Sequence, residues 1–415
     1  MIGIKNVVAI VCGGGPAPGI NSVISAITIE ASKHGWDVLG ICDGFSRIAH
    51  GEKKYIRLDY DKIRRIHQTG GCILQMSRYN PTKKESDLRT VVDTLTELGV
   101  NYLVTIGGDD TAYSSSAIAA YAKQLGRTIN VVHVPKTIDN DLPLPEGVPT
   151  FGFETARAFG TEEIENLMED ARTSNNRWYF TIAMGRTAGH LALGMGRSAG
   201  AAVTIIPEEF SQETIPLQQV VDILTGTIVK RYLTGNNYGV AVIAEGVIEK
   251  IRPEDFESLG ALVLDEHGHI RYAELDFGLI LKKAVLEEVK KLGIHISIVD
   301  KEIGYELRCA TPIAYDIDYA RSLGYEAVQF LLRGESGALI TIQDNQAKPL
   351  TFEEIKDPDT GKTKVRRVNI NSVHYKIARG FMMRMEKGDL DDPGFANAYH
   401  MTLDEFRKRY EYLFD

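Results

Sequence analysis

The sequence lacks the features that would place it in several classes of protein. It has only four cysteines, Cys12, Cys42, Cys72 and Cys309, and no C-x-x-C pair of the kind that binds zinc or acts as a redox dithiol. No apolar run approaches the ~18 residues of a membrane-spanning helix, and no basic segment followed by a long apolar stretch opens the chain. We therefore expect buried, reduced thiols in a cytoplasmic protein.

The chain also lacks a surplus of positive charge. Its 47 Lys and Arg residues stand against 56 Asp and Glu residues, which gives a formal net charge of -9. Nucleic acids and anionic lipid surfaces select basic faces, so we expect neither a nucleic acid nor a membrane as a partner. Any phosphate site must be formed locally. The length of 415 residues, 44% of them hydrophobic, is enough for two or three compact units.

Short, apolar, β-branched runs alternate with longer segments of helical period, which is typical of parallel strands joined by crossover helices. The expected strands are 7–12, 37–41, 102–106, 131–134, 179–183, 203–206 and 240–244. The expected helices include 20–33, 87–98, 114–125, 162–171 and 403–414. The pattern predicts an α/β fold.

The proline-rich segment 141–149 can continue neither a helix nor a central strand. We interpret it as the crossing between two related α/β lobes that face a cleft. The predicted first lobe is 1–145 with about 309–335, and the second is 146–308 with part of the C-terminal segment. A C-terminal extension, 336–415, is expected to pack on the lobes.

A glycine-rich segment, 12–21, lies between the first expected strand and the first expected helix. Glycines at such a position let backbone N–H groups approach an anion, and the helix adds the positive end of its dipole. The segment has neither the Walker spacing nor a strict G-x-G-x-x-G. A tight connection without a ligand explains such a turn equally well.

Two adjacent acids, Asp109 and Asp110, follow Gly107 and Gly108 at the end of another expected strand. The carboxyl end of a strand in a doubly wound sheet is where ligands bind. Mg2+ suits Asp109, with phosphate and water oxygens completing its coordination. The alternative is that Asp109 or Asp110 caps the following helix.

The segment 135–141 brings a lysine, a hydroxyl and two carboxylates to the end of a third expected strand. This mixture favours phosphoryl transfer over packing, because a carboxylate can accept the proton of an attacking hydroxyl. We assign that role to Asp139. The letters Asp-Asn-Asp are also a good turn sequence, and that alternative stays open.

A fourth strand end carries Met184, Gly185 and Arg186. The planar guanidinium of Arg186 matches a phosphate, so this residue is a candidate clamp for a substrate. Glu245 and Arg308 join this set only if the fold brings them near.

These segments occur in one order, and together they resemble the 6-phosphofructokinase family over residues 7–332. The motifs that carry the resemblance are G-G-x-A-P-G-x-N, G-G-D, P-x-T-I-D-N-D, M-G-R and G-Y-x-x-R. The resemblance implies two similar, Rossmann-like, three-layer lobes with mostly parallel sheets, the first for the phosphoryl donor and the second for fructose 6-phosphate. It also implies transfer to the sugar 1-hydroxyl.

The resemblance assigns a role to each matching position. Asp139 becomes the base, with Thr137 and Asp141 beside it, and Asp109 the Mg2+ ligand. The residues implied for the donor are Gly14, Arg78, Lys83 and Gly108, and those implied for the sugar phosphate are Met184, Gly185, Arg186, Glu245, Tyr305 and Arg308. Arg177 matches an arginine that reaches a neighbouring subunit, which implies a homodimer or homotetramer.

Two positions distinguish the donor. ATP-using members of the family typically have glycine where this chain has Asp110, and many have glycine where it has Lys136. A carboxylate at the first position adds bulk and like charge against the rest of ATP, and a cation at the second can stabilise charge on the transferred group. The pair resembles pyrophosphate-dependent members.

Three alternatives remain. An ATP-dependent phosphofructokinase would share every motif except this pair. A catalytically silent sugar-phosphate sensor would require neither Asp139 nor Asp109. A dinucleotide oxidoreductase is disfavoured, because the first turn lacks the glycine spacing that such enzymes use.

Overall fold

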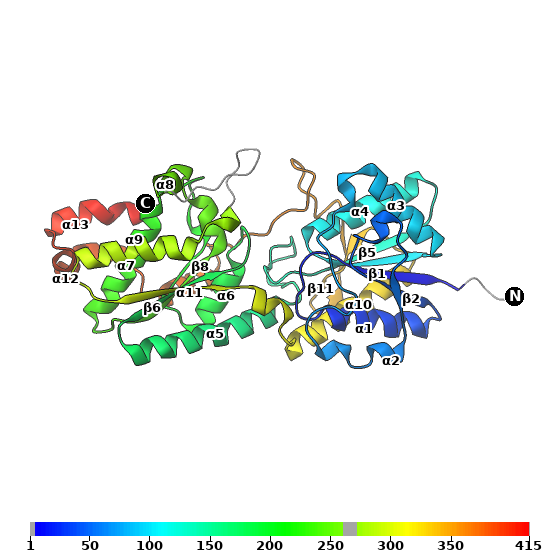
Figure 1. Cartoon of the computed structure of the whole chain (residues 1–415), viewed down its shortest axis with the longest axis horizontal. Coiled ribbons are helices and arrows are strands. Elements are labelled where there is room, and N and C mark those ends of the chain that lie inside the picture. Colours follow the sequence, from blue (N-terminus) through cyan, green and yellow to red (C-terminus); the bar gives the residue numbers. More distant parts are fainter. Residues whose placement is uncertain (1–4, 260–271, 415) are drawn as a thin grey trace. The chain divides into compact units, whose positions relative to one another are not determined.

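The computed structural model describes residues 5–259 and 272–414. The chain forms two compact units (Figure 1). Unit 1 consists of Met1–Ala156 and Tyr305–Arg366, and unit 2 consists of Arg157–Gly304 and Arg367–Asp415.

Unit 1 is built on a seven-stranded sheet in the order β13-β10-β5-β4-β1-β2-β3. The strands are β1 (Val7–Cys12), β2 (Asp37–Ile41), β3 (Tyr55–Leu58), β4 (Tyr102–Gly107), β5 (Asn130–Pro135), β10 (Ala338–Leu339) and β13 (Leu350–Thr351). The inner five are parallel, and the two edge strands, β3 and β13, are antiparallel to their neighbours. A separate hairpin joins β11 (Ile342–Gln343) and β12 (Gln346–Ala347).

Helices cover both faces of this sheet, because the central strands carry apolar side chains on both faces. In β1, Val8 and Ile10 pack with α1 (Ile20–Lys33) and α10 (Ala314–Leu332), whereas Ala9 and Val11 face the opposite core. That second core contains side chains of α3 (Glu85–Glu97) and α4 (Asp109–Gln124). Unit 1 is thus a three-layer α/β unit, completed by the short α2 (Tyr60–Ile63).

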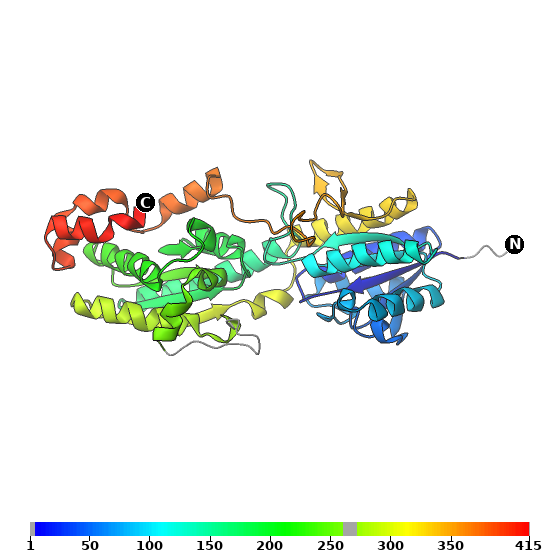
Figure 2. The ribbon, with the colours of Figure 1, turned by 90° about the horizontal axis from the view of Figure 1, so that it is seen from above.

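Unit 2 has a four-stranded parallel sheet in the order β7-β8-β6-β9. Its strands are β6 (Arg177–Ala183), β7 (Val203–Ile205), β8 (Gly239–Ala244) and β9 (Ser297–Ile303). Its helices are α6 (His190–Ala199), α7 (Leu217–Leu233), α8 (Pro253–Ser258), α9 (Phe277–Lys291), α11 (Val373–Phe381), α12 (Pro393–Ala398) and α13 (Leu403–Tyr410). Figure 2 shows the last three, in orange and red, beside the green helices of the same unit, where α12 packs on α7.

The prediction of an α/β fold with mostly parallel sheets is confirmed. All seven strands expected from the sequence are present, and β1, β2 and α1 have the predicted bounds. The sequence reading did not identify β9. This edge strand carries Asp300, Lys301 and Glu302, and charged residues are common on an edge strand because they oppose further pairing.

The chain passes from unit 1 to unit 2 at a different place from the predicted one. The proline-rich segment 141–149 lies wholly in unit 1, and the boundary falls after Ala156, inside α5 (Phe153–Ser174). The predicted C-terminal extension, 336–415, is divided between the two units, because residues up to Arg366 belong to unit 1 and those from Arg367 to unit 2. Long-range hydrogen bonds of Arg366, described below, hold the proline-rich segment in unit 1.

The prediction that all four cysteines are buried is wrong. Cys12 and Cys42 are buried, but Cys72 is only partly buried and Cys309 is exposed. Within the described ranges, no helix has the length and apolar character needed to cross a bilayer.

Candidate functional site

The glycine-rich turn that follows β1 lies against two other loops at the carboxyl end of the unit 1 sheet. Gly14 has a φ of 83°, which glycine adopts without the strain that a side chain would bring. Its N–H donates to the Ser77 carbonyl at 2.9 Å. Gly13 tolerates no side chain either, because a Cβ there would lie 2.4 Å from Oγ1 of Thr111 in α4.

The segment 70–78 carries Arg78 to this turn. Ser77, the residue before it, pairs with Gly13 as an isolated parallel bridge, and the exposed Arg78 follows directly. The segment is held from the other side by Asp43, whose N–H donates to the Leu74 carbonyl at 3.0 Å.

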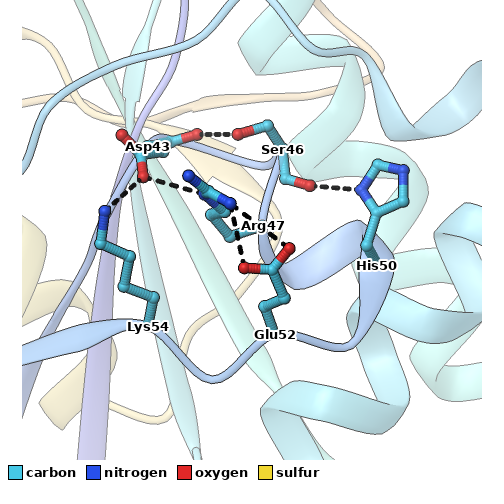
Figure 3. Close-up of polar contacts among 6 residues, drawn as sticks. All are labelled: Asp43, Ser46, Arg47, His50, Glu52 and Lys54. Carbon is cyan, nitrogen blue, oxygen red and sulfur yellow. Dashed lines mark hydrogen bonds and ion pairs between the residues drawn. The ribbon is translucent and has the colours of Figure 1, made fainter.

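Asp43 belongs to a polar cluster that holds the turn after β2 (Figure 3). Its carboxylate accepts from Lys54 at 2.9 Å and from Arg47 at 3.2 Å. Arg47 also pairs with Glu52 at 3.1 Å. Asp43 has a φ of 61°, a conformation that Asp adopts more readily than most residues. The cluster thus holds this turn, and with it the loop that carries Arg78.

The two acids of the Gly-Gly-Asp-Asp motif are the first two residues of α4, after Gly108 as its N-cap. Neither side chain caps the helix, so the capping alternative is wrong. Asp109 is half-buried, whereas Asp110 is exposed. The positive end of the helix dipole attracts negative charge in the first turn, and both acids lie there, at the end of the sheet.

His133, which the sequence reading did not single out, positions this motif from β5. Its Nε2 lies 3.1 Å from the Gly107 carbonyl and its Nδ1 2.8 Å from Oγ1 of Thr105. Because a carbonyl can only accept, Nε2 carries the proton and Nδ1 accepts from the hydroxyl. Burial lowers the pKa of His133 to about 3, so the ring is neutral. A histidine within an apolar strand was the only signal in the sequence.

Lys136 is buried, with 5% of its surface exposed, directly after β5. Its Nζ donates to the Gly15 carbonyl at 2.6 Å and lies 3.6 Å from where a Cβ on Gly14 would be. Burial lowers its pKa to about 8, and Asp139 opposes that shift, whereas Arg308 adds to it. The structure therefore places a titratable cation beside the glycine-rich turn.

Three predicted residues lie buried in the loop after Lys136. Thr137, Asp139 and Asp141 are 7%, 9% and 7% exposed. The N–H of Asp139 donates to Oγ1 of Thr137 at 3.0 Å, and Oγ1 of Thr150 donates to the Thr137 carbonyl at 2.7 Å. The loop is therefore ordered by its own bonds, and it is a turn as well as a candidate site.

Arg366, which is distant in the sequence, also binds this loop. Its guanidinium donates to the carbonyls of Asn140, Leu144, Pro145 and Val148 at 3.0, 3.3, 3.2 and 2.8 Å, and also to the Asn140 side chain. Its own N–H donates to the Asp141 carbonyl at 2.7 Å. Burial lowers the pKa of Arg366 to about 10. No local pattern in the sequence pointed to it.

Replacing Arg366 with methionine is expected to loosen this loop. The change leaves several partly buried carbonyls without their donor, at up to about 1–3 kcal/mol for each unsatisfied group, so we expect a lower melting temperature and faster hydrogen exchange over residues 137–150. Lysine cannot reproduce the planar fork, and Arg366→Lys should behave similarly. Lys362→Met, in an exposed turn of the same segment, is the control. Unchanged exchange over 137–150 in Arg366→Met would contradict the bracing role.

Tyr305 and Arg308 lie in unit 1, beside the glycine-rich turn. The Arg308 guanidinium is 3.5 Å from where a Cβ on Gly15 would be and stacks on the Tyr305 ring at 4.7 Å. Lys83 ends a short 3-10 turn, Pro81–Lys83, that packs on α4 and exposes its side chain. Unit 1 thus brings together the candidate donor residues, and Tyr305 and Arg308 with them.

The remaining predicted residues lie in unit 2. Glu245 follows β8, and its Oε1 accepts the N–H of Gly185 at 3.0 Å and that of Arg186. Arg186 is exposed with a φ of 54°. Gly185 has no room for a side chain, because a Cβ there would lie 2.7 Å from the Ala188 carbonyl. Glu245 therefore fixes the loop after β6 that carries Met184 and Arg186.

Two further residues of unit 2 hold the same loop. Arg367 donates to the Thr187 carbonyl, and Glu208 accepts from Gly189 at 3.0 Å. Arg177, at the start of β6, pairs with Asp170 at 2.8 Å, and this contact within the chain raises the pKa of Arg177.

A magnesium ion would need further ligands beyond Asp109. Among the residues that the structure describes, no three His, Cys, Asp or Glu side chains come together in an arrangement that could hold a metal ion. A single carboxylate at the end of a strand, with substrate phosphate and water as the other ligands, is the usual protein contribution to a magnesium site of the phosphoryl-transfer type. Asp109 fits that type.

Comparison with known proteins identifies sequences and structures that are similar to this chain. It is 51% identical to a pyrophosphate–fructose 6-phosphate 1-phosphotransferase of Thermotoga maritima, over 97% of each chain. It is 46% identical to an enzyme of the same name from Naegleria fowleri, over 99% of this chain and 96% of that one. The fold matches the crystal structure of a pyrophosphate-dependent phosphofructokinase from Marinobacter aquaeolei, with a TM-score of 0.68 and 19% identity over 91% of each chain. The phosphofructokinase family model matches residues 7–331, and the chain belongs to the phosphofructokinase family.

Proposed function

We propose that this protein transfers a phosphoryl group from pyrophosphate to the 1-hydroxyl of fructose 6-phosphate, giving fructose 1,6-bisphosphate and orthophosphate, in a reversible step of glycolysis and gluconeogenesis. The observation that carries the proposal is the buried Lys136, whose ammonium lies at the glycine-rich turn with Asp139 near it. The names of the two relatives that align with nearly the whole chain support the donor and the acceptor. A cytoplasmic location belongs to the same proposal.

Unit 1 supplies the donor site in this proposal. Gly14 and Gly108 line the donor site and leave room for the phosphates, and Lys136, Arg78 and Lys83 supply positive charge. Lys136 stabilises the charge that develops on the transferred group, and it acts strongly because it is buried and already oriented. Asp109 would hold Mg2+, which would supply positive charge that neutralises the phosphates.

Asp139 serves as the general base. The loop bonds of Thr137 and Thr150 hold its backbone, and its carboxylate lies near enough to Lys136 to oppose the lowering of that lysine's pKa. As the 1-hydroxyl oxygen attacks phosphorus in line, its proton passes to the Asp139 carboxylate. In the reverse direction Asp139 returns that proton. Thr137 and Asp141 line the acceptor side of the same loop.

Unit 2 supplies most of the sugar-phosphate site. The guanidinium of Arg186 binds the 6-phosphate through two or more N–H donors. Glu245 holds the loop that carries Arg186. Met184, Gly185 and Glu245 are proposed to contact the sugar, and Tyr305 and Arg308, which belong to unit 1, keep the sugar-phosphate role that the family resemblance implies. Arg177 is proposed to reach a neighbouring subunit in a homodimer or homotetramer, which requires it to leave Asp170.

The direct test is a donor assay. Purified protein with Mg2+ and fructose 6-phosphate should turn over with pyrophosphate and, supplied with fructose 1,6-bisphosphate and orthophosphate, should form pyrophosphate. Coupled spectrophotometric assays with each donor measure both directions. Turnover with ATP and none with pyrophosphate would support the ATP-dependent alternative, and binding of the sugar phosphate without turnover would support the sensor.

Asp110 excludes ATP in this proposal, and Asp110→Gly should raise the ratio of kcat/KM for ATP to that for pyrophosphate at least tenfold. Because Asp110 is exposed, repulsion between its carboxylate and a phosphate charge ~4 Å away in a nearly aqueous medium contributes only ~1 kcal/mol. The size of the Asp110 side chain must supply the remaining discrimination against ATP. Asp110→Asn removes the charge and keeps the bulk. It should admit much less ATP than Asp110→Gly. An unchanged donor ratio in the glycine variant would assign the exclusion elsewhere.

A further inference from the structure

A cavity of unit 1 lies between three segments that are far apart in the sequence. It is lined by residues 145–149, by one face of α10 and by the β11–β12 hairpin, and its volume is about 680 Å³. Pockets that hold small ligands typically measure about 300–1,000 Å³. None of the residues assigned to the phosphoryl donor or to the sugar phosphate lines this cavity. The cavity is therefore large enough for a small molecule and is not used by the proposed reaction.

Two tyrosines of α10, Tyr315 and Tyr319, supply the aromatic part of the lining. Their ring centroids are 5.8 Å apart, and the ring planes are tilted by 38°. Tyr315 is 48% exposed. The hydroxyl of Tyr319 is buried and has no hydrogen-bond partner among the described residues. Because a buried hydroxyl without a partner costs free energy, the wall of this cavity has an unused place for a polar atom of a ligand.

The charged side chains of the lining are all acidic. Among the described residues that line the cavity there is no Lys, Arg or His, whereas Glu146, Asp318 and Asp344 are present. Asp344 pairs with Lys348 at 2.8 Å. Glu146 and Asp318 form no ion pair with any residue that the structure describes. The lining therefore favours a ligand with positive charge.

We propose that this cavity binds a primary organic amine with an apolar body, and that the bound amine stabilises the loop 137–150. An ammonium group has three N–H donors, and the carboxylates of Glu146 and Asp318 and the oxygen of Tyr319 are three acceptors for them. Tyrosine rings attract the same cation. The prolines of the segment 145–149 supply apolar surface for the body of the ligand.

A neighbouring cavity of about 580 Å³ shares Asp318 and part of the hairpin with the first. Its lining includes the cations Lys33 and Arg321 beside Glu30 and Glu326, and Lys33 pairs with Glu30 at 3.0 Å. An amine would meet like charge in this second cavity. We therefore place the amine in the first cavity.

The segment 145–149 links the first cavity to the loop that carries Asp139. The Arg366 guanidinium donates to the carbonyls of Pro145 and Val148 at 3.2 and 2.8 Å, and to that of Asn140 at 3.0 Å. Arg366 does not line the cavity, and its N–H donors are bonded to these carbonyls. A ligand that packs on the segment 145–149 holds the same carbonyls in place, so it should slow the opening of the whole loop.

The binding experiment uses 2-phenylethylamine as the probe and the full-length protein without substrates. The control ligands are 2-phenylethanol, a neutral molecule of the same shape, and trimethyl(2-phenylethyl)ammonium, a cation without N–H donors. In a titration followed by ligand-observed NMR near neutral pH, we expect a Kd for the amine on the order of 1 mM. The alcohol should bind roughly tenfold more weakly, because it lacks the charge, and the trimethylated cation should also bind more weakly than the amine.

Hydrogen exchange followed by mass spectrometry tests the effect on the loop. At ten times the Kd of the amine, openings that release the ligand become about tenfold rarer, so exchange over residues 137–150 should slow by at least about threefold. The alcohol at the same concentration should have a much smaller effect. Binding of the amine with unchanged exchange over 137–150 would overturn the link to the loop.

Three variants locate the bound amine. Tyr319→Phe removes only the hydroxyl, so the Kd should rise about fivefold, whereas the melting temperature of the free protein should stay the same or rise. Glu146→Gln should raise the Kd by a similar factor. Glu326→Gln, in the lining of the second cavity alone, is the matched control and should bind the amine normally.

Four results would overturn the site. They are no saturable binding of the amine, equal affinity for the amine and the alcohol, normal binding by Tyr319→Phe and Glu146→Gln, and a larger loss in Glu326→Gln than in Glu146→Gln. Equal or tighter binding of the trimethylated cation would overturn the assignment of a primary amine. Failure of the protein to use pyrophosphate would contradict the proposed function only, because the binding and exchange measurements contain no substrate.

Discussion

Asp139→Asn is expected to lower kcat by roughly 10²- to 10⁴-fold, the contribution of a positioned general base. Asparagine keeps the size of the side chain but cannot accept the proton. The loop should survive the change, because it is held by the Asp139 N–H, the Thr150 hydroxyl and Arg366, none of which is altered. The loss should therefore appear in kcat, with the affinity for fructose 6-phosphate within about threefold of the natural value.

Rates in both directions make this test sharp. Because the equilibrium constant of the reaction is independent of the enzyme, the rate at low concentrations of both substrates must fall by the same factor forward and backward. Calorimetric titration with fructose 6-phosphate measures binding separately. Asp61→Asn, at an exposed position of α2 in the same unit, is the matched control. Near-normal turnover in Asp139→Asn would remove this residue from the role of base.

Lys136→Met is expected to lower kcat/KM for pyrophosphate by about 10²- to 10³-fold, the loss typical of removing one oriented donor from a developing charge. The affinity for fructose 6-phosphate should change little. Burial alone makes the ammonium costly to hold in the folded protein, which is why its pKa falls to about 8. Methionine removes that cost, so we expect the melting temperature to be unchanged or higher. A destabilised variant would indicate a structural role for Lys136.

The lowered pKa of Lys136 also predicts a pH dependence. Lys136 is charged below a pH of about 8 and loses its proton above it, so kcat/KM for pyrophosphate should fall as the pH rises through that value. The bound polyanion favours the charged form, so kcat should fall only at higher pH. Pyrophosphate has its own ionisation, which acts on every variant.

A comparison of variants separates the two ionisations. The limb near pH 8 should disappear from the residual activity of Lys136→Met and persist in Lys123→Met, which removes an exposed charge at the end of α4. The same limb in Lys136→Met would assign it to the substrate and contradict the role of this lysine.

The positions of the motifs were predictable from the sequence because their signals are local. A glycine-rich turn between an apolar run and a segment of helical period can be recognised from neighbouring residues alone. The candidate side chains were therefore correctly expected at the ends of β1, β4, β5, β6 and β8. Polar strands gave no such signal. The charged edge strand β9 was missed for that reason.

The sequence by itself determined the α/β class, the strands along the chain and the candidate residues at their ends, since periodicity and turn composition act over a few residues. Only the tertiary structure decided that Arg366 braces the loop 226 positions before it and that Arg308 lies at Gly15. Such contacts depend on how the fold brings together segments that are far apart in the sequence. A contact between two distant residues leaves no pattern in a single sequence, because it does not change the composition of the residues around either partner.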